Sequence, residues 1–562
     1  MKFKILSFIS LLLLVSSMLS FAQVGEVGTF VGRVTDNEGE PLPGVEVTAR
    51  NIERGLTQST ITNQKGMYRL ERLPRGLYEI TAKLPGFKTT VRKGLELFAG
   101  AVTTVDIQME IGTIEEEVTV IGETPMVETT RSEVSTVMTE KELLSYPQQN
   151  RNYLYLMQYA PGTQPDAPTI GGSGFAVNGM RGESNNYMID GLNNNDITDN
   201  TMQTTLLPPE SIQEFRLITN NFNAEYGRNM GGILNVVMKS GTNEFHGSAW
   251  AFYRGDSAFF RSADWLTGER EPYKRYQYGA TLGGPIVRDK TFFFFTFEGI
   301  SQDISQVTSR YFLTPEAIAT ATGPAKTFFD KYGSAYPVPT YDFVDKNNDG
   351  VPDYGRAALS YSDTFKSYMA GIKIDHIFSE KDRIAFRWMF NFREFKDGLS
   401  YYWVPGKQLE RPNKFHTGGL TWLHIFGPTV YNEVRLGYHR DDWEWRVQDE
   451  SITYFDFNDE LMGFGDPGYP MTQVNNTFQL VDVLNIQVKD HNLKFGGEFR
   501  YWTVSSSFDA FVNGYYIFTD GLAFLSNSPP AYLILGADPP DNKENPYLPG
   551  DPQGERRTGF GL

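Results

Sequence analysis

Apolar and polar residues alternate along the second half of the chain, from Phe245 onward. Between residues 383 and 393 the two faces of an extended strand differ sharply. Large apolar side chains lie on one face and polar ones on the other, namely Ile384, Phe386, Trp388, Phe390 and Phe392 against Arg383, Arg387, Asn391 and Arg393. Successive side chains of a strand point to opposite sides, so this strand suits lipid on one face and water on the other. The pattern predicts a strand that crosses a membrane.

The links between the alternating runs fall into two classes. Short links occur at 379–382 and 489–492, whereas the stretches 313–363 and 441–474 are long. Short turns on one side of the membrane and long loops on the other are typical of an antiparallel transmembrane barrel. Since about 9–11 residues are needed to cross the bilayer, we expect about eleven strands within residues 245–518. A soluble β-sandwich is the alternative explanation of the alternation.

The composition supports a barrel over a helical membrane protein. Aromatic residues make up 14% of the chain, yet the mean hydropathy is −0.37. This combination fits a barrel, in which only alternate residues face lipid and aromatic side chains mark the interfaces. Acidic residues outnumber basic ones by 68 to 51, so nucleic acid is not an expected partner. The chain contains no cysteine, which excludes disulfides and thiolate metal sites.

The N-terminus has the layout of a secretory signal peptide, residues 1–22. A short basic stretch, Met1–Lys4, precedes an apolar run at 5–15 and the small-residue site at 20–22. The apolar run is too short to span a bilayer, and no later stretch of about 18 apolar residues follows. We therefore expect an exported protein without a transmembrane helix.

Residues 23–111 predict a small β-sandwich. Short alternating strands are separated by turns rich in glycine and proline, such as those at 39–44, 74–76 and 85–86. The segment resembles the carboxypeptidase regulatory-like domain, which has a carbohydrate-binding-like fold. The resemblance implies a non-catalytic module that acts as a spacer or docking unit. Sugar binding is the alternative, and it follows from the fold class alone.

Residues 125–240 contain a series of ordered motifs. The positions that carry them are Asn178, Gly179 and Arg181, then Asp190 and Gly191, then Glu225, Tyr226, Gly227 and Arg228. In this order the motifs resemble the plug domain of TonB-dependent receptors, and the continuation at 245–248 resembles the Oar-like subfamily. The resemblance implies an α+β plug inside a transmembrane barrel of roughly 22 strands.

Two roles are open for the charged plug residues Arg181, Glu225 and Arg228. They can pair with charges on the barrel wall and hold the plug in place, or they can contact the ligand directly. The glycines of the motifs permit tight turns inside a crowded lumen.

The linker at 112–124 contains a β-prone stretch with acidic residues before it, Glu117, Val118, Thr119, Val120, Ile121 and Gly122. It can be the last strand of the sandwich or an ordinary linker. Its place between an exported accessory domain and a plug-like segment favours a resemblance to a TonB box. Such a segment binds TonB by pairing its extended backbone with an edge strand.

One motif has the spacing of a calcium loop. Oxygen-bearing side chains alternate at Asp345, Asn347, Asp349 and Asp353, with Gly350 allowing a sharp turn. Arg356 stands where an EF-hand has its bidentate glutamate, so the loop resembles the shorter calcium repeats of extracellular proteins. A polar surface turn is the alternative. No cofactor is required otherwise.

The sequence lacks catalytic signatures such as His-Glu-x-x-His, Gly-x-Ser-x-Gly or a phosphate-binding Gly-Lys-Ser/Thr loop, so no enzyme is expected. We expect a mainly β receptor of the outer membrane with its N-terminal domain in the periplasm. Its partners would be TonB, outer-membrane lipid and an unidentified extracellular ligand. An adhesion or interaction protein without transport is the alternative. Residues 241–562 would form the N-terminal part of the barrel, because the chain ends without an aromatic-ended closing strand.

Overall fold

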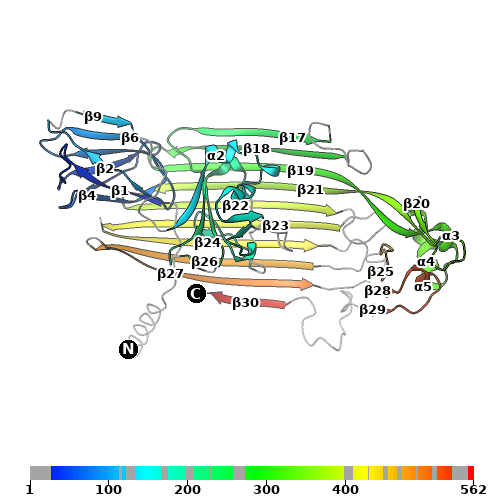
Figure 1. Ribbon diagram of the computed structural model, residues 1–562. Helices are drawn as coiled ribbons and strands as arrows, with labels where there is room; N and C mark the ends of the chain where they lie inside the picture. Colours follow the sequence, from blue (N-terminus) through cyan, green and yellow to red (C-terminus); the bar gives the residue numbers. More distant parts are fainter. Residues whose placement is uncertain are drawn as a thin grey trace, which may run out of the picture.

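The computed structural model arranges three β-rich units along the chain (Figure 1). It describes the following residues: 27–112, 117–121, 133–165, 175–197, 207–224, 226–227, 229–256, 272–397, 409–427, 429–446, 454–464, 471–488, 491–508, 515–534 and 555–561. The predicted signal peptide, Gly122, Glu225 and Arg228 lie outside the described residues.

The first unit is a sandwich of two sheets. One sheet has the order β4–β1–β7 with β8 also on β1, and the other has the order β3–β2–β5–β6–β9. The strands are β1 (Val27–Thr35), β2 (Glu46–Asn51), β3 (Thr57–Ile61), β4 (Met67–Pro74), β5 (Gly76–Lys83), β6 (Thr89–Leu97), β7 (Val102–Thr104), β8 (Ile107–Gln108) and β9 (Glu117–Ile121). Alternate side chains such as Phe30, Ala49, Leu70 and Ile80 are fully buried between the sheets, because the period of two sends one face inward.

The second unit is the plug, built on a five-stranded sheet of order β10–β15–β16–β13–β14. Its elements are β10 (Val134–Thr139), α2 (Glu140–Ser145), η1 (Gln149–Arg151), η2 (Tyr153–Tyr159), β11 (Thr163–Pro165), β12 (Phe175–Val177), η3 (Gly182–Ser184), β13 (Asn186–Ile189), β14 (Leu192–Asn193), η4 (Pro209–Ser211), β15 (Ile212–Asn220) and β16 (Ile233–Met238). Helix α2 begins at Thr139, where Thr139 and Glu142 form a reciprocal capping box.

The third unit is a long antiparallel sheet of 11 strands, counting β20, which pairs with β21 beside the main path. Its strands are β17 (His246–Gly255), β18 (Tyr273–Val287), β19 (Thr291–Leu313), β20 (Tyr341–Val344), β21 (Tyr354–Ile377), β22 (Asp382–Asp397), β23 (Leu409–Gly427), β24 (Val430–Trp445), β26 (Met471–Val488), β27 (His491–Phe508) and β30 (Glu555–Gly561). The path runs from β17 to β30, and these two strands are not paired with each other in the described residues.

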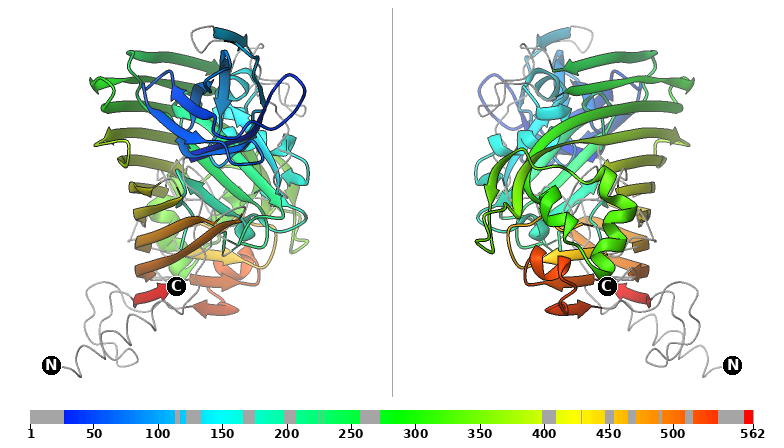
Figure 2. Two further views of the ribbon diagram at one scale, coloured as in Figure 1. Left: turned by 90° about the vertical axis from the view of Figure 1, so that its left-hand side faces the viewer. Right: turned by 90° about the vertical axis from the view of Figure 1, so that its right-hand side faces the viewer.

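The two faces of this sheet have opposite character. The plug lies against one face (Figure 2), which is lined by buried polar residues such as Lys373, Arg387 and Arg435. The other face exposes aromatic side chains, including Phe386 and Trp388. The predicted alternation on β22 is therefore present, and it gives a polar surface for the plug and an apolar surface directed outward.

The plug and the long sheet share one hydrophobic core. Phe294, Met369 and Met389 of the sheet are buried together with plug residues such as Phe215 and Val236. This packing holds the plug against the sheet. The polar contacts described below then fix its exact position.

The two long stretches predicted as loops fold in part. Strand β21 begins at Tyr354 and β26 at Met471, so both strands extend into the predicted loops. The segment 313–353 also contains α3 (Pro315–Ala319), α4 (Gly323–Tyr332) and η5 (Gly333–Ala335). These elements pack with β25 (Tyr454–Phe457), β28 (Tyr515–Phe518) and α5 (Gly521–Leu525), and β29 (Tyr532–Ile534) pairs with β28. We call this assembly the aromatic cap, because Phe329, Phe455, Phe464, Phe518 and Phe524 form its core.

In the part of the chain that the structure describes, every helix is too short or too polar to span a bilayer.

Candidate functional site

The tip of one plug hairpin reaches the wall of the long sheet. Strands β13 and β14 are joined by Asp190 and Gly191, whose φ angles are +49° and +73°. Two consecutive residues with positive φ form the tight turn that glycine and aspartate tolerate best. The sequence motif Asp190–Gly191 is therefore explained first by the turn geometry, and this turn places the Asp190 carboxylate against the sheet.

Asp190 is the centre of a buried ion cluster. Its Oδ2 lies 3.2 Å from Arg387 Nη1 and 3.5 Å from Lys373 Nζ, and its Oδ1 accepts a hydrogen bond of 2.9 Å from the backbone N–H of Met238. Lys373 and Arg387 are 1% and 3% exposed. One carboxylate thus joins the plug to β21 and β22 of the wall. Breaking this contact would take the Asp190 carboxylate away from two buried cations, which is strongly unfavourable.

The residues after Asp190 fit into a groove on the wall. A Cβ on Gly419 would lie 2.6 Å from Leu192 Cδ1, and one on Gly437 would lie 3.2 Å from Leu192 Cδ2. The two glycines face each other on β23 and β24, so their missing side chains make room for Leu192. The backbone N–H of Asn193 also donates to Gln479 Oε1 at 3.1 Å. The hairpin tip is held by charge, by shape and by a hydrogen bond.

The other plug motifs lie within the plug itself. Asn178 and Gly179 form a second tight turn, with φ angles of +52° and +78°, and Asn178 Nδ2 donates to the carbonyl of Thr219. Tyr226 is buried in a small cluster of plug side chains, and Gly227 lies in the loop that follows it. Arg181 is exposed and precedes η3. A charged contact between a plug motif and the wall is made by Asp190. Glu225 and Arg228 lie outside the described residues, so the roles of Arg181, Glu225 and Arg228 stay predictions.

The TonB-box-like segment forms strand β9. It pairs in parallel with β6 at the edge of the sandwich, with Val118 beside Thr90 and Val120 beside Arg92. The structure thus places it as the last strand of the sandwich sheet, one of the two alternatives that the sequence left open. The two descriptions are compatible, because a five-residue edge strand is also a template for pairing with another strand.

The predicted calcium ligands lie in a tight turn next to the aromatic cap. Gly350 has a φ of +88°, and Asp345, Asn347 and Asp349 accept hydrogen bonds from the backbone N–H groups of the turn. Asp353 Oδ2 accepts from the backbone N–H of Lys346 at 2.8 Å. Among the described residues, no group of three or more acidic or histidine side chains is arranged to hold a metal ion. Carboxylate and amide side-chain oxygens are the ligands that calcium prefers. In this structure they accept hydrogen bonds from backbone N–H groups of the turn, so calcium binding stays a prediction.

This prediction can be checked by protease digestion. If calcium binds the loop, Asp349→Ala should remove calcium-dependent protection of residues 340–356, because the variant loses one of four oxygen ligands. The digestion is compared in calcium and in chelator. Asp330→Ala, which changes an exposed acidic residue of α4 outside the loop, is the control. Equal digestion of the unmodified protein in calcium and in chelator would reject the site.

We call the wall residues that contact the tip of the β13–β14 hairpin the hairpin seat, namely Lys373, Arg387, Gly419, Gly437 and Gln479. The sequence did not reveal several of them. Lys373 and Arg387 could be assigned to the polar face of their strands from the alternation, but nothing indicated that both would contact Asp190. Gly419 and Gly437 carried a weaker signal, since glycines inside a strand often mark a close approach of another chain segment.

Comparison with known families agrees with this architecture. A model described as an outer membrane beta barrel domain matches residues 237–539, more than half of the chain. A TonB-dependent receptor plug domain matches residues 128–233, and a carboxypeptidase regulatory-like domain matches residues 29–110. The chain therefore belongs to the outer-membrane β-barrel family and carries the domain set of a TonB-dependent receptor.

Within this class the chain is similar to the TonB-dependent transporter Oar of Myxococcus xanthus. The two are 30% identical over 291 residues, which cover 49% of this chain and 27% of the relative. The family resemblance, its Oar-like character and the mainly β fold inferred from the sequence are thereby confirmed. The family is one of receptors and transporters.

Solved structures with a similar arrangement include two from Escherichia coli. The outer membrane transporter YddB is 14% identical, with a TM-score of 0.45, over 69% of this chain and 50% of that one. The ferric-catecholate import receptor Fiu is 13% identical, with a TM-score of 0.40, over 76% and 66%. The chain thus spans half the length of the first of these proteins.

Proposed function

We propose that the protein imports a scarce ligand across the outer membrane, with energy supplied by TonB. The observation that carries this proposal is the seat of the plug hairpin. The shared hydrophobic core already packs the plug against the wall, and a plug that never moved would need no further contact. Here one carboxylate, Asp190, joins the plug to two buried cations of the wall. Such a contact holds strongly in one position and is lost as a unit when the plug moves, as expected of a gate.

Strand β9 is the proposed point of contact with TonB. It lies at the edge of its sheet and is followed by the residues that lead to the plug, which begins at Glu133 in the described chain. A partner strand added to β9 would pull on the plug through this connection. In this arrangement the sandwich lies in the periplasm, on the same side as TonB.

The import hypothesis is tested by uptake. A deletion strain is grown on a panel of scarce nutrients that includes ferric chelates, oligosaccharides and peptides. A nutrient that supports the parent but not the deletion strain is then supplied in radiolabelled form, with TonB present or absent. We expect uptake only with TonB present. Equal accumulation of the radiolabelled nutrient with TonB present and with TonB absent would overturn the proposal.

A second candidate function is adhesion or interaction through the sandwich. One observation favours it: a polar groove between the two sheets is lined by Arg33, Arg92, Asp106 and Gln108, with Val118 of β9 at its side. Polar side chains of this kind suit a carbohydrate or another polar ligand. Binding of the labelled nutrient without accumulation, in cells with TonB as well as in cells without it, would favour this function over import.

A further inference from the structure

The sandwich is docked onto both other units of the molecule. Figure 1 shows it at one end of the long sheet, beside the plug. The contacts come from three places in the sandwich: the end of β4, the turn after β2 and the segment after β6. Each contact meets a different element of the sheet or the plug.

The first contact is made by Arg72 near the end of β4. Its guanidinium carbon lies 3.2 Å from the ring centroid of Tyr431 on β24, and its carbonyl accepts a hydrogen bond of 3.2 Å from Arg383 Nη1 on β22. Arg72 is 2% exposed and has a φ of +61°. A buried non-glycine residue in the left-handed region is strained, and such positions cluster where a contact matters for function.

The second contact involves the turn after β2, the link between β16 and β17, which contains Asn243, and the short turn between β18 and β19, which contains Asp289. The backbone N–H of Asn243 donates to the carbonyl of Glu53 at 3.0 Å, and Asn243 Nδ2 donates to Asp289 Oδ1 at 2.7 Å. Gly55 lies so close that a Cβ on it would be 2.5 Å from Asp289 Oδ1. The sandwich and the sheet therefore approach so closely here that there is no room for a side chain at Gly55.

The third contact reaches the plug. The backbone N–H of Ala99 donates to Glu214 Oε1 at 2.6 Å, and Glu214 belongs to the plug strand β15. Glu214 is 1% exposed, and burial raises its pKa to about 7. The sandwich thus covers a carboxyl group of the plug and holds it by a backbone hydrogen bond.

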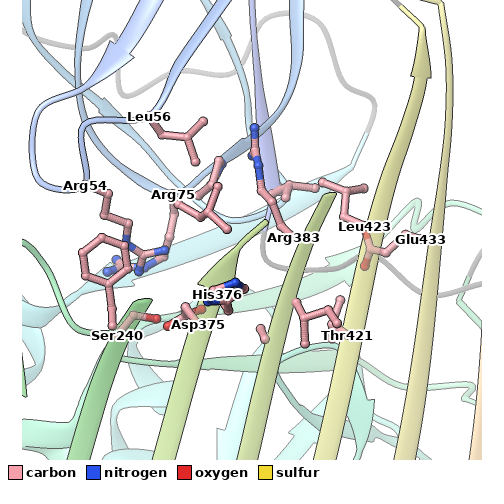
Figure 3. Close-up of a pocket in the computed structure, with 16 residues that line it drawn as sticks. Arg54, Leu56, Arg75, Ser240, Asp375, His376, Arg383, Thr421, Leu423 and Glu433 are labelled. Carbon is pink, nitrogen blue, oxygen red and sulfur yellow. The ribbon is translucent and has the colours of Figure 1, made fainter. Parts of the chain in front are cut away.

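The interface between these contacts is incompletely packed, and it mixes apolar side chains such as Leu56, Phe292 and Leu423 with charged ones. A cavity of about 80 Å³ lies between Arg54 and Arg75 of the sandwich and Asp375 and Arg383 of the sheet (Figure 3). In the described structure, Asp375 Oδ2 and Arg383 Nε are buried without a hydrogen-bond partner. Permanent domain contacts are usually dry and apolar, whereas polar contacts with unsatisfied groups separate more easily. The interface has the character of a releasable contact.

We propose that the sandwich is a second gate, which braces the plug strand β15 and the adjacent end of the barrel wall and must undock before the plug can leave its seat. This inference rests on the proposed function, since a gate has a role only in a protein that opens. Of the two roles expected for the sandwich, spacer or docking unit, this proposal selects the docking unit and adds that it controls the plug. TonB pulling on β9, an edge strand of the sandwich, would act on this gate first.

A reversible tether tests the gate. The chain has no cysteine, so the pair Gly55→Cys and Asp289→Cys introduces one disulfide across the docked interface without competing thiols. The complete receptor that carries both substitutions is placed in a planar lipid bilayer, and potassium chloride conductance is recorded while urea is added on the sandwich side. This readout requires neither TonB nor a nutrient, so its outcome is independent of the uptake experiment.

We expect the oxidised double variant to show at least a tenfold loss of conducting events, and reduction with dithiothreitol to restore them. The reduced double variant carries the same two substitutions without the tether, so it is the matched control, and the effect of the tether is the difference between the oxidised and the reduced form. If the oxidised double variant opens at the same urea concentration and with the same frequency as its reduced form, the sandwich is not a gate.

Discussion

Asp190→Ala is expected to weaken the seating of the plug by about 3–5 kcal/mol, because it removes the carboxylate that lies against two buried cations, Lys373 and Arg387. Hydrogen exchange at the amides of β13 and β16, followed by mass spectrometry, measures this loss as faster local opening. Since 1.36 kcal/mol corresponds to a factor of ten, exchange should accelerate by about 100-fold or more.

A charge-free variant is the matched control for this prediction. In Asp190→Ala combined with Lys373→Met and Arg387→Met, the two buried cations are removed together with the carboxylate, so most of the protection should return. A single variant that exchanges like the unmodified protein would show that the cluster does not hold the plug. An equal loss in the single and triple variants would assign the effect to the turn and not to the charges.

Val120→Pro is expected to weaken the binding of TonB strongly. Proline removes a backbone donor from β9 and fixes φ, so strand addition fails, whereas Val120→Ala keeps the donor and should be mild. The measurement is the affinity of the purified periplasmic domain of TonB for the detergent-solubilised receptor. We expect a loss of about 100-fold for proline and little change for alanine, because the main chain supplies most of the affinity.

Because Val120 also pairs with Arg92 of β6, the sandwich itself must be followed in the same variants. Unchanged hydrogen exchange in β5 would show that the sandwich remains folded. If Val120→Pro binds TonB with the affinity of the unmodified protein, β9 is only the last strand of the sandwich and TonB binds elsewhere.

The sequence predicted the long sheet well, because its signal is local. A period of two identifies each strand and its polar face, and the structure places Arg387 and Trp388 on opposite faces of β22 as the pattern indicated. The contact between Asp190 and Arg387 joins residues 197 positions apart. No local pattern specifies such a pairing, so the motif at Asp190 could be recognised but its partner could not.

The aromatic cap was missed for a similar reason. Helix α4 is short, and its buried face packs against Phe464 and Phe524 from two other segments. Without these distant partners a helix of 10 residues has little stability of its own, and its sequence resembles a loop. The β9 segment is a different case, since one of the interpretations drawn from the sequence, the last strand of the sandwich, agrees with its pairing with β6, whereas the TonB-box interpretation stays a prediction.

If the aromatic cap faces the ligand in the proposed importer, its shared core also affects how the ligand is met. Three segments, 313–353, 454–464 and 515–534, contribute to one buried cluster and cannot move independently of one another. The conformational entropy of these segments is therefore lost when the protein folds and not when a ligand arrives. Ligand recognition at this end would resemble the docking of two rigid surfaces, and an exchange of one segment alone would disturb the shape of the other two.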